Sequence, residues 1–210
     1  MLLNQFFKKL NMKRKSLSAT KKTLNFYLTK LKDPQVRKLY SLFSNNLASM
    51  DLTNKKIMVG VSGGADSLAV LFFSKCYALK HHSKLYPVII DHKLRKESTI
   101  EAKNLKYKLK QNFKINCKIL SKKIVKINKN IQSYARDLRY DLFFEECNKQ
   151  KIDYLILGHH KDDLIENFFI RFLRGSGLKG LVSFEKKVKI YNGINVIRPF
   201  LTTSKKDLLK

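Results

Sequence analysis

The sequence is poor in acids, cysteine, proline and tryptophan. It has 16 Asp and Glu against 44 Lys and Arg, three Cys, three Pro and no Trp. Cys76, Cys117 and Cys147 lie far apart and never form a Cys-x-x-Cys pair, so neither a disulfide framework nor a zinc ribbon is indicated. No apolar run is long enough to cross a bilayer. These absences predict a cytoplasmic protein without a membrane partner.

The shortage of acids leaves a formal net charge of +28 and a pI near 10.1. Clustered Lys and Arg release counterions from a phosphate backbone, so this charge favours a polyanionic partner such as RNA. The alternative is the mutational bias of an AT-rich genome, tolerated on a solvated surface. The charge therefore supports an RNA partner without establishing it. The sequence leaves the oligomeric state open, including a homodimer.

A length of 210 residues, 44% of them hydrophobic, accommodates one full α/β domain with appendages. No acid precedes Asp33, and apolar residues recur at helical spacing on both sides of Asp33-Pro34, which predicts a break and a helix restart. We therefore predict a basic helical N-terminal extension over 1–54, a nucleotide-binding domain over 55–203 and the start of a further segment over 204–210. Whether the extension packs on the domain or touches RNA stays open.

From Lys55 onward, apolar segments alternate with helical ones. Within the apolar segments, apolar and polar residues do not alternate, which is typical of strands buried on both faces of a sheet. Four successive β–α units predict an α/β fold with an open, doubly wound parallel sheet, in which ligands bind beyond the carboxyl ends of the strands. We expect strands over 56–61, 86–91, 115–120 and 153–157, and helices over 67–80, 97–112, 130–149 and 162–173.

The first predicted strand runs into a glycine-containing loop, and an apolar helix follows. Glycines let the backbone turn sharply and approach a ligand, while the N–H groups that begin the helix point at it, so the loop is an anion pocket that suits phosphate. An acid stands where a Walker A loop carries Lys, and a carboxylate beside phosphates needs a bridging cation such as Mg²⁺. The pattern resembles the signature of the ATP pyrophosphatase superfamily; a plain glycine turn is the alternative. The loop is Ser62, Gly63, Gly64, Ala65, Asp66 and Ser67.

Two further motifs follow later strands. Asp91 and His92 come directly after the second strand, where main-chain and carboxylate groups reach a nucleoside, although an Asp there is commonly a turn residue. Arg136 and Arg139 share a helical face without an acid three or four residues away, so an external phosphate would relieve their repulsion. The alternative is that both arginines point to water or pair across the fold.

The densest motif is Gly158-His159-His160-Lys161-Asp162-Asp163, followed by Glu166, at the end of the fourth strand. Asp163 and Glu166 are three apart, so they share a helical face on which they hold either Mg²⁺ or a substrate ammonium. Acids in a first helical turn also simply stabilise the helix dipole. Zinc is disfavoured, because adjacent histidines project differently and no cysteine is near.

Arg171 and Arg174 precede a glycine-rich stretch that reaches Gly180, and again no acid stands at helical spacing. A basic glycine-rich loop lies close to a nucleic-acid backbone or to pyrophosphate. A helix C-cap with a flexible link is the alternative.

Together, in order and spacing, the motifs resemble the tRNA(Ile)-lysidine synthetase family over about residues 55–203. The segments that carry the resemblance are 62–67, 91–98, Ala135-Arg136 with Arg139-Tyr140, 159–166, 173–177 and Arg198-Pro199-Phe200-Leu201. The resemblance implies that ATP activates the C2 carbonyl oxygen of the wobble cytidine in an isoleucine tRNA with a CAU anticodon, releasing pyrophosphate. The ε-amine of free L-lysine then displaces AMP and leaves lysidine.

The resemblance also implies residue roles, with ATP as a substrate and Mg²⁺ as the cofactor. The catalytic residues would be Asp66, Arg136, Asp163 and Glu166, of which Asp163 and Glu166 would bind the substrate lysine. Mg²⁺ would bind Asp66, with Asp163 as a second candidate ligand. The tRNA would bind Arg139, Arg171 and Arg174. ATP would bind Ser62, Gly63, Gly64, Ala65, Asp66, Ser67, Asp91 and His92.

Members of that family carry further domains after the nucleotide domain, whereas this sequence stops at Lys210. We therefore expect either a C-terminal truncation or a chain in which the basic surface and the N-terminal extension replace the missing domain. Two alternatives remain. A tRNA thiolation enzyme of the same superfamily typically needs a cysteine pair for sulfur or an iron–sulfur cluster, and none is spaced correctly here. A catalytically inactive RNA-binding module would keep the basic faces but would not need the acids.

Overall fold

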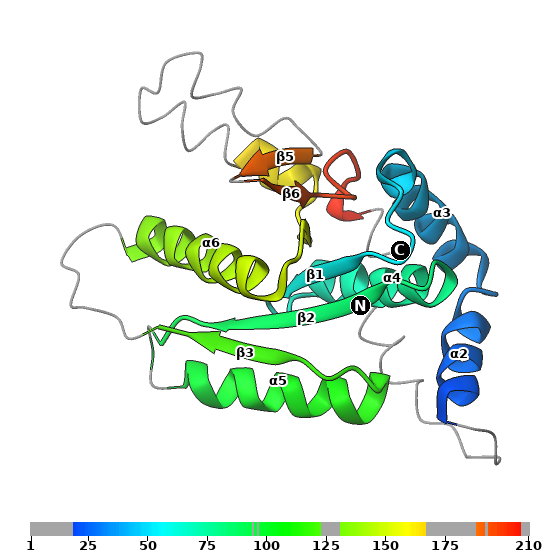
Figure 1. Ribbon diagram of the computed structural model, residues 1–210, viewed down its shortest axis with the longest axis horizontal. Helices are drawn as coiled ribbons and strands as arrows, with labels where there is room; N and C mark the ends of the chain where they lie inside the picture. The colour runs from blue at the N-terminus through cyan, green and yellow to red at the C-terminus, as the bar shows by residue number, and fades with distance from the viewer. Residues whose placement is uncertain are drawn as a thin grey trace.

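A computed structural model describes residues 19–93, 95, 97–122, 131–166, 188–191 and 193–206 of the protein. Its centre is a six-stranded sheet with the order β3-β2-β1-β4-β6-β5 (Figure 1). The strands are β1 (Lys56–Val61), β2 (Lys84–Asp91), β3 (Lys118–Ser121), β4 (Tyr154–Ile156), β5 (Val188–Tyr191) and β6 (Ile194–Ile197). The helices are α2 (Ala19–Lys30), α3 (Pro34–Leu47), α4 (Ala65–Lys80), α5 (Ser98–Phe113) and α6 (Ile131–Gln150), with a 3₁₀ turn η1 (Ala48–Met50).

The sheet is doubly wound, as the sequence predicts. From β1 the chain moves outward to β2 and β3, then crosses to place β4 on the other side of β1, and every pair among these strands is parallel. Helix α6 lies on the opposite side of the sheet from α5 (Figure 1). The direction of winding therefore reverses between β1 and β4, and ligands of such sheets bind beyond the carboxyl ends of the strands at that point.

The β5–β6 hairpin is not predicted by the sequence. Strand β6 continues the parallel sheet beside β4, whereas β5 pairs antiparallel with β6 and forms the edge. Both strands have only four residues, so they give a weak periodic signal. The sheet therefore has one antiparallel edge strand, which is common on otherwise parallel sheets.

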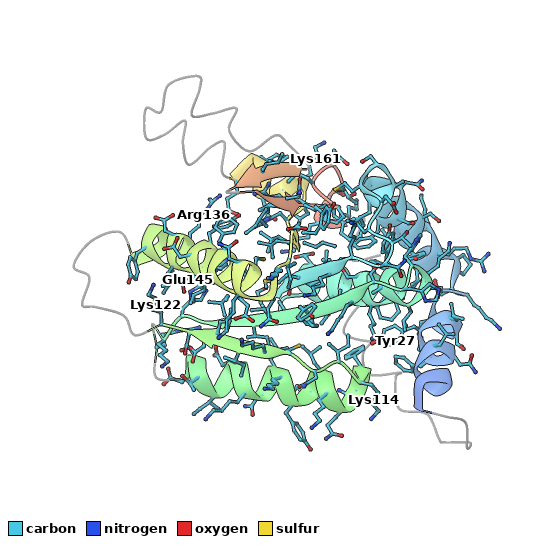
Figure 2. The ribbon with its side chains drawn as sticks, viewed as in Figure 1. Tyr27, Lys114, Lys122, Arg136, Glu145 and Lys161 are labelled. Atoms are coloured by element: carbon cyan, nitrogen blue, oxygen red, sulfur yellow. The ribbon has the colours of Figure 1, made fainter. Side chains whose placement is uncertain are left out.

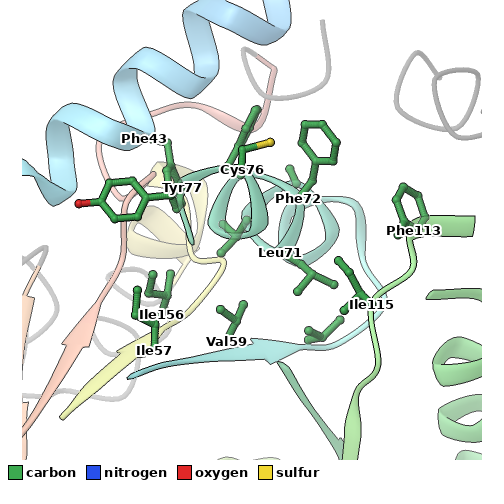
Figure 3. Packing of buried hydrophobic residues seen from close by; sticks show 14 of the residues in the cluster. Phe43, Ile57, Val59, Leu71, Phe72, Cys76, Tyr77, Phe113, Ile115 and Ile156 are labelled. Atoms are coloured by element: carbon green, nitrogen blue, oxygen red, sulfur yellow. The ribbon is translucent and has the colours of Figure 1, made fainter. Parts of the chain in front are cut away.

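Alternate residues of β1 point to the two faces of the sheet. Ile57 and Val59 join a core with α4, and Met58 joins a second core with Phe143 of α6. Figure 3 shows the first core between α4 and the strands. On the other face a Cβ at Gly60 would lie 2.7 Å from Phe143, so α6 packs directly on the backbone of β1. This close approach holds α6, with its arginines, over the sheet.

Helices α2 and α3 pack on the domain, while contact of these residues with RNA stays untested. The side chains of Tyr27 and Phe43 are buried in the same core as α4, and the Tyr27 hydroxyl donates to the Phe113 carbonyl at 2.7 Å. The predicted break is confirmed: Asp33 caps α3 by accepting from the backbone N–H groups of Gln35 and Val36. The boundary between residues 54 and 55 stays a prediction. None of the described helices is long and apolar enough to span a membrane.

Candidate nucleotide-binding site

The loop between β1 and α4 places two glycines in different conformations. Gly63 has φ +89°, in the left-handed region that favours glycine. Gly64 is extended, with φ −69° and ψ 157°, and caps α4 without a side-chain hydrogen bond. A Cβ on Gly64 would meet only Ser62 Oγ, at 3.7 Å. The backbone therefore requires glycine at 63 but not at 64, where the missing side chain leaves the amino end of α4 open.

The Ser67 hydroxyl ties the loop together. It donates to the Gly64 carbonyl at 2.9 Å and accepts from the backbone N–H of Ser62 at 3.2 Å and from Ser62 Oγ at 3.1 Å. Helix α4 begins at Ala65 rather than at 67, so Ala65 and Asp66 belong to its first turn. The loop is thus held in shape by its own serines, and their contacts to phosphate stay a prediction.

The end of β4 packs against this loop through Gly158. A Cβ there would lie 2.9 Å from Ser67 Cα and 3.0 Å from Ser67 N, which are backbone atoms that cannot move aside cheaply. Only glycine allows that approach. It brings the two histidines that follow to the first turn of α4.

His160 connects Asp66 to Asp163. Its Nε2 lies 3.4 Å from Asp66 Oδ2 and its Nδ1 lies 3.6 Å from Asp163 Oδ2, contacts that become ion pairs when the imidazole is protonated. Asp66 Oδ1 is buried and has no hydrogen-bond partner. A buried carboxylate oxygen without a partner is costly, so this atom suits a bound cation.

Mg²⁺ fits this position if the protein and a substrate phosphate both provide its ligands. Within the described part of the chain, no group of three or more His, Cys, Asp or Glu is placed to hold a metal ion alone. Mg²⁺ is usually bound by one or two carboxylates together with substrate phosphates, so a protein cage is not needed. Asp66 would supply the carboxylate oxygen of such an arrangement, and its role as a metal ligand stays a prediction.

The two acids after His160 also organise the backbone. Asp163 Oδ2 accepts from the backbone N–H of His160 at 2.8 Å, as in the second half of a capping box. Asp162 Oδ2 accepts from the backbone N–H of Lys205 at 2.7 Å. Residues 161–166 are helical, and Glu166 is exposed. Asp163 and Glu166 therefore share the helical face predicted for them, while Asp163 also has a structural role.

A group of three arginines acts on His159, the residue before His160. Burial, then the charges of Arg198, Arg136 and Arg139, lowers the pKa of His159 to about 3. Arg139 NH2 lies 3.2 Å from His92 Nε2, and burial together with Arg139 lowers the pKa of His92. Figure 2 shows Arg136 on the side of α6 that faces β5 and β6. Both histidines are thus neutral at pH 7 beside concentrated positive charge.

Arg198 joins this group, although the sequence did not assign it a role. It follows β6 directly, the residue is 3% exposed, and its NH2 donates to the Tyr140 hydroxyl at 3.4 Å. Its signal in the sequence is an Arg-Pro pair after an apolar run, which is weak unless β6 is recognised as a strand. A buried guanidinium at the carboxyl end of a parallel strand is placed to face an anionic ligand.

The Asp91 carboxylate is used inside its own turn. It accepts hydrogen bonds from the Thr99 hydroxyl at 2.6 Å, the Ser98 hydroxyl at 2.8 Å and the Lys93 N–H at 2.9 Å. Burial opposes ionisation of this carboxyl, but these hydrogen bonds outweigh it and lower the pKa of Asp91. Asp91 therefore fixes the start of α5, and its contact with a nucleoside stays a prediction.

The described site combines an open helix terminus, a carboxylate suited to a cation and a group of arginines, all at one edge of the sheet. That arrangement is suited to a polyphosphate, whose charge it would stabilise. Arg171, Arg174 and the glycine-rich stretch lie outside the described residues.

The PP-loop domain family matches residues 31–210 of the chain. Curated proteins named tRNA(Ile)-lysidine synthase are similar to it: that of Orientia tsutsugamushi (strain Boryong) is 42% identical over 75% of this chain and 35% of its own length. That of Wolbachia pipientis wMel is 37% identical over 80% of this chain and 39% of its own length. That of Rickettsia rickettsii (strain Sheila Smith) is 35% identical over 82% of this chain and 36% of its own length. The chain thus spans between a third and two fifths of the length of these relatives.

A solved structure has the same fold. It is the U34-tRNA thiolase NcsA from Methanococcus maripaludis with its [4Fe-4S] cluster, which superposes with a TM-score of 0.71 over 85% of this chain and 62% of its own, at 22% identity. At that identity the likeness concerns the fold alone.

Proposed function

Because the chain belongs to the PP-loop family, we propose that it is the nucleotide-binding part of a tRNA(Ile)-lysidine synthase. The proposed reaction is the ATP-dependent ligation of L-lysine to C2 of the wobble cytidine in a tRNA(Ile) with a CAU anticodon, through an adenylated cytidine. The products are lysidine, AMP and pyrophosphate. The observation that carries the proposal is the buried, unpartnered oxygen of Asp66 at the open terminus of α4, beside the arginines around His159.

The first half of the proposed reaction uses the loop and α6. The N–H groups at the start of α4 and the hydroxyls of Ser62 and Ser67 would hold the departing pyrophosphate. Mg²⁺ bound at Asp66 would offset the negative charge that grows on this leaving group. Arg136 would contact the α-phosphate, so that the C2 oxygen of the cytosine attacks phosphorus in line with the leaving pyrophosphate.

The second half uses the acids after β4. Asp163 and Glu166 would bind the ammonium of the substrate lysine and accept its proton, since only the neutral amine is a nucleophile. The amine then attacks C2 and AMP leaves. Arg139, Arg171 and Arg174 would hold the tRNA through its phosphates.

The cysteines argue against thiolation as the function. All three are buried, and burial raises the pKa of the Cys76, Cys117 and Cys147 thiols to about 12. Sulfur transfer needs an accessible thiolate, which buried thiols of raised pKa do not offer.

The test incubates the protein with ATP, labelled lysine and an unmodified tRNA(Ile) transcript. We expect label in the RNA together with released pyrophosphate. Asp66→Asn should abolish pyrophosphate release and leave RNA retention on a filter unchanged. Asp153→Asn is the matched control, because Asp153 is exposed before β4, at the opposite edge of the sheet. ATP consumption without label in the RNA would identify a different acceptor, and unchanged turnover of Asp66→Asn would refute the assignment of that residue.

A further inference from the structure

The outer face of α5 carries a row of cations with an aromatic ring between them. Lys103, Tyr107 and Lys110 follow one another at spacings of four and three, so they share one side of the helix, and Lys114 is the residue directly after the helix, with φ +55°. All four are exposed, and Tyr107 is 64% exposed. We call these four residues the α5 stripe. Figure 2 shows Lys114 at the end of the helix.

Compositional bias alone does not explain the α5 stripe. In the same chain α6 keeps four acids, two of which form ion pairs with lysines: Glu146 with Lys118 at 2.8 Å and Glu145 with Lys122 at 3.1 Å. In α5 the only acid is Glu101, in its first turn. Among the described residues, no ion pair with an acid involves the α5 stripe. The Lys114 ammonium donates instead to the Gln111 carbonyl at 2.9 Å.

Helix α5 starts at the carboxyl edge of the sheet, where the nucleotide site lies, and runs to the opposite edge, where the chain turns into β3. The Ser98 hydroxyl at its start donates to Asp91 at the carboxyl end of β2, and the Leu105 side chain would lie 3.1 Å from a Cβ on Gly63. No described element covers the outer side of α5 (Figure 1). At about 1.5 Å per residue the row from Lys103 to Lys114 is about 16 Å long, over which a nucleic-acid strand presents several phosphates.

We propose that the α5 stripe binds the sugar–phosphate backbone of the substrate RNA, with the three lysines on phosphates and Tyr107 stacked on a base or ribose. This inference rests on the proposed function and names a surface that receives the RNA along the helix that begins beside the nucleotide site and leads away from it. Exposed lysines alternating with an aromatic ring suit RNA, because charge neutralisation and stacking act together on a flexible strand.

The test measures binding of a fluorescent RNA stem–loop with a CAU loop, over a range of NaCl concentrations and without ATP or lysine. The triple variant Lys103→Gln, Lys110→Gln, Lys114→Gln should lower the RNA affinity about tenfold or more, and the slope of log affinity against log salt should fall by about two to three. Tyr107→Leu should lower affinity at least about fivefold without changing that slope.

The matched control is Lys55→Gln, Lys80→Gln, Lys149→Gln, which removes three exposed lysines outside α5. It should leave the affinity close to that of the unchanged protein. Equal losses in both triple variants, or no loss in the first, would overturn the inference. ATP binding, measured separately by equilibrium dialysis, should be the same in all variants. A protein that binds ATP but never labels RNA would instead contradict the proposed function, so the two failures are distinguishable.

Discussion

Gly64 and Gly158 both border the loop between β1 and α4, but for different reasons. At 158 a side chain would strike the backbone of Ser67, so that glycine serves the packing of β4 on α4. At 64 a side chain would meet nothing closer than 3.7 Å. Glycine there is not required by the fold, which suggests a role in leaving room for a ligand. Glycine at 158 therefore serves folding, whereas glycine at 64 is expected to serve ligand binding.

We expect Gly158→Ala to lower the free energy of unfolding by roughly 1–3 kcal/mol, because backbone atoms must shift to admit the new methyl group. Gly64→Ala should change that free energy by less than about 0.5 kcal/mol and should weaken ATP binding. Urea denaturation and equilibrium dialysis with ATP measure the two effects. Equal stability of both variants would contradict this separation.

His159 makes stability depend on pH. Its pKa is about 3 in the folded protein, below the ordinary 6.5, so between these values the unfolded chain binds a proton that the folded chain does not. Stability conferred by the neutral imidazole is therefore complete above pH 6.5 and is lost as pH falls. We expect His159 to account for a loss of about 1–2 kcal/mol between pH 7 and pH 5.

Urea denaturation of the unchanged protein and of His159→Gln, at pH 7 and pH 5, measures that contribution. The variant should lose less stability than the unchanged protein between these two pH values. An identical pH dependence in both proteins would show that His159 is not buried neutral beside the arginines.

The sequence placed the loop before a helix and the two arginines on α6 correctly, because these signals are local, while the roles assigned to those residues stay predictions. It did not predict that His160 lies between Asp66 and Asp163, since that contact depends on how closely β4 packs on α4. It also gave Arg198 no role, because β6 is too short to be recognised. Contacts between distant segments follow from packing, which local patterns do not encode.

At the scale of elements, a single side chain separates α2 from α3. Asp33 is extended, with φ −61° and ψ 127°, and its Oδ1 accepts from Gln35 N at 2.9 Å and from Val36 N at 3.2 Å. Pro34 occupies the first turn, where its missing N–H costs nothing. The helix restart was predicted from these two residues alone, because capping depends on neighbours in sequence.

Replacing Asp33 by Ala should lower the free energy of unfolding by about 1 kcal/mol, since two N–H groups of α3 lose their acceptor. Asp33→Asn retains an acceptor oxygen and should stay close to the unchanged protein. Thermal or urea denaturation compares the three proteins. A loss as large for Asn as for Ala would mean that the charge, not the cap, stabilises α3.

Other element boundaries differ from prediction for physical reasons. Strand β3 begins at Lys118 rather than 115, because pairing with β2 starts only there. Ile115 and Cys117 are apolar and buried but precede the paired residues. Helix α4 begins two residues early, because Gly64 caps it. The predicted helix over 162–173 is described only to residue 166, and its later part lies outside the described residues.

At the scale of the whole molecule, α3 and the sheet share one core. Phe43 is fully buried, with its ring centroid 5.8 Å from those of Phe73 in α4 and Phe200 after β6. Segments from the beginning, middle and end of the described chain therefore meet at one side chain. The sequence predicted the helix that carries Phe43 but not this meeting point.

Phe43→Ala should lower the free energy of unfolding by about 3–5 kcal/mol, through lost burial and the cavity left behind. Because the core is shared, circular dichroism and tyrosine fluorescence should report the same transition. Leu28→Ala, at a residue that is 49% exposed, should cost less than about 0.5 kcal/mol. Two separate transitions in the unchanged protein would show that α3 unfolds independently.

The segment after β6 contacts residues 160–162 at several points. Thr203 O accepts from Lys161 N at 2.9 Å, Lys205 N donates to Asp162 at 2.7 Å, and Phe200 forms a bridge with His160. A displacement of this segment would therefore be transmitted mechanically to Asp163, and through His160 to Asp66. A partner that binds the chain near Lys205 would therefore change the distance between the Asp66 and Asp163 carboxylates.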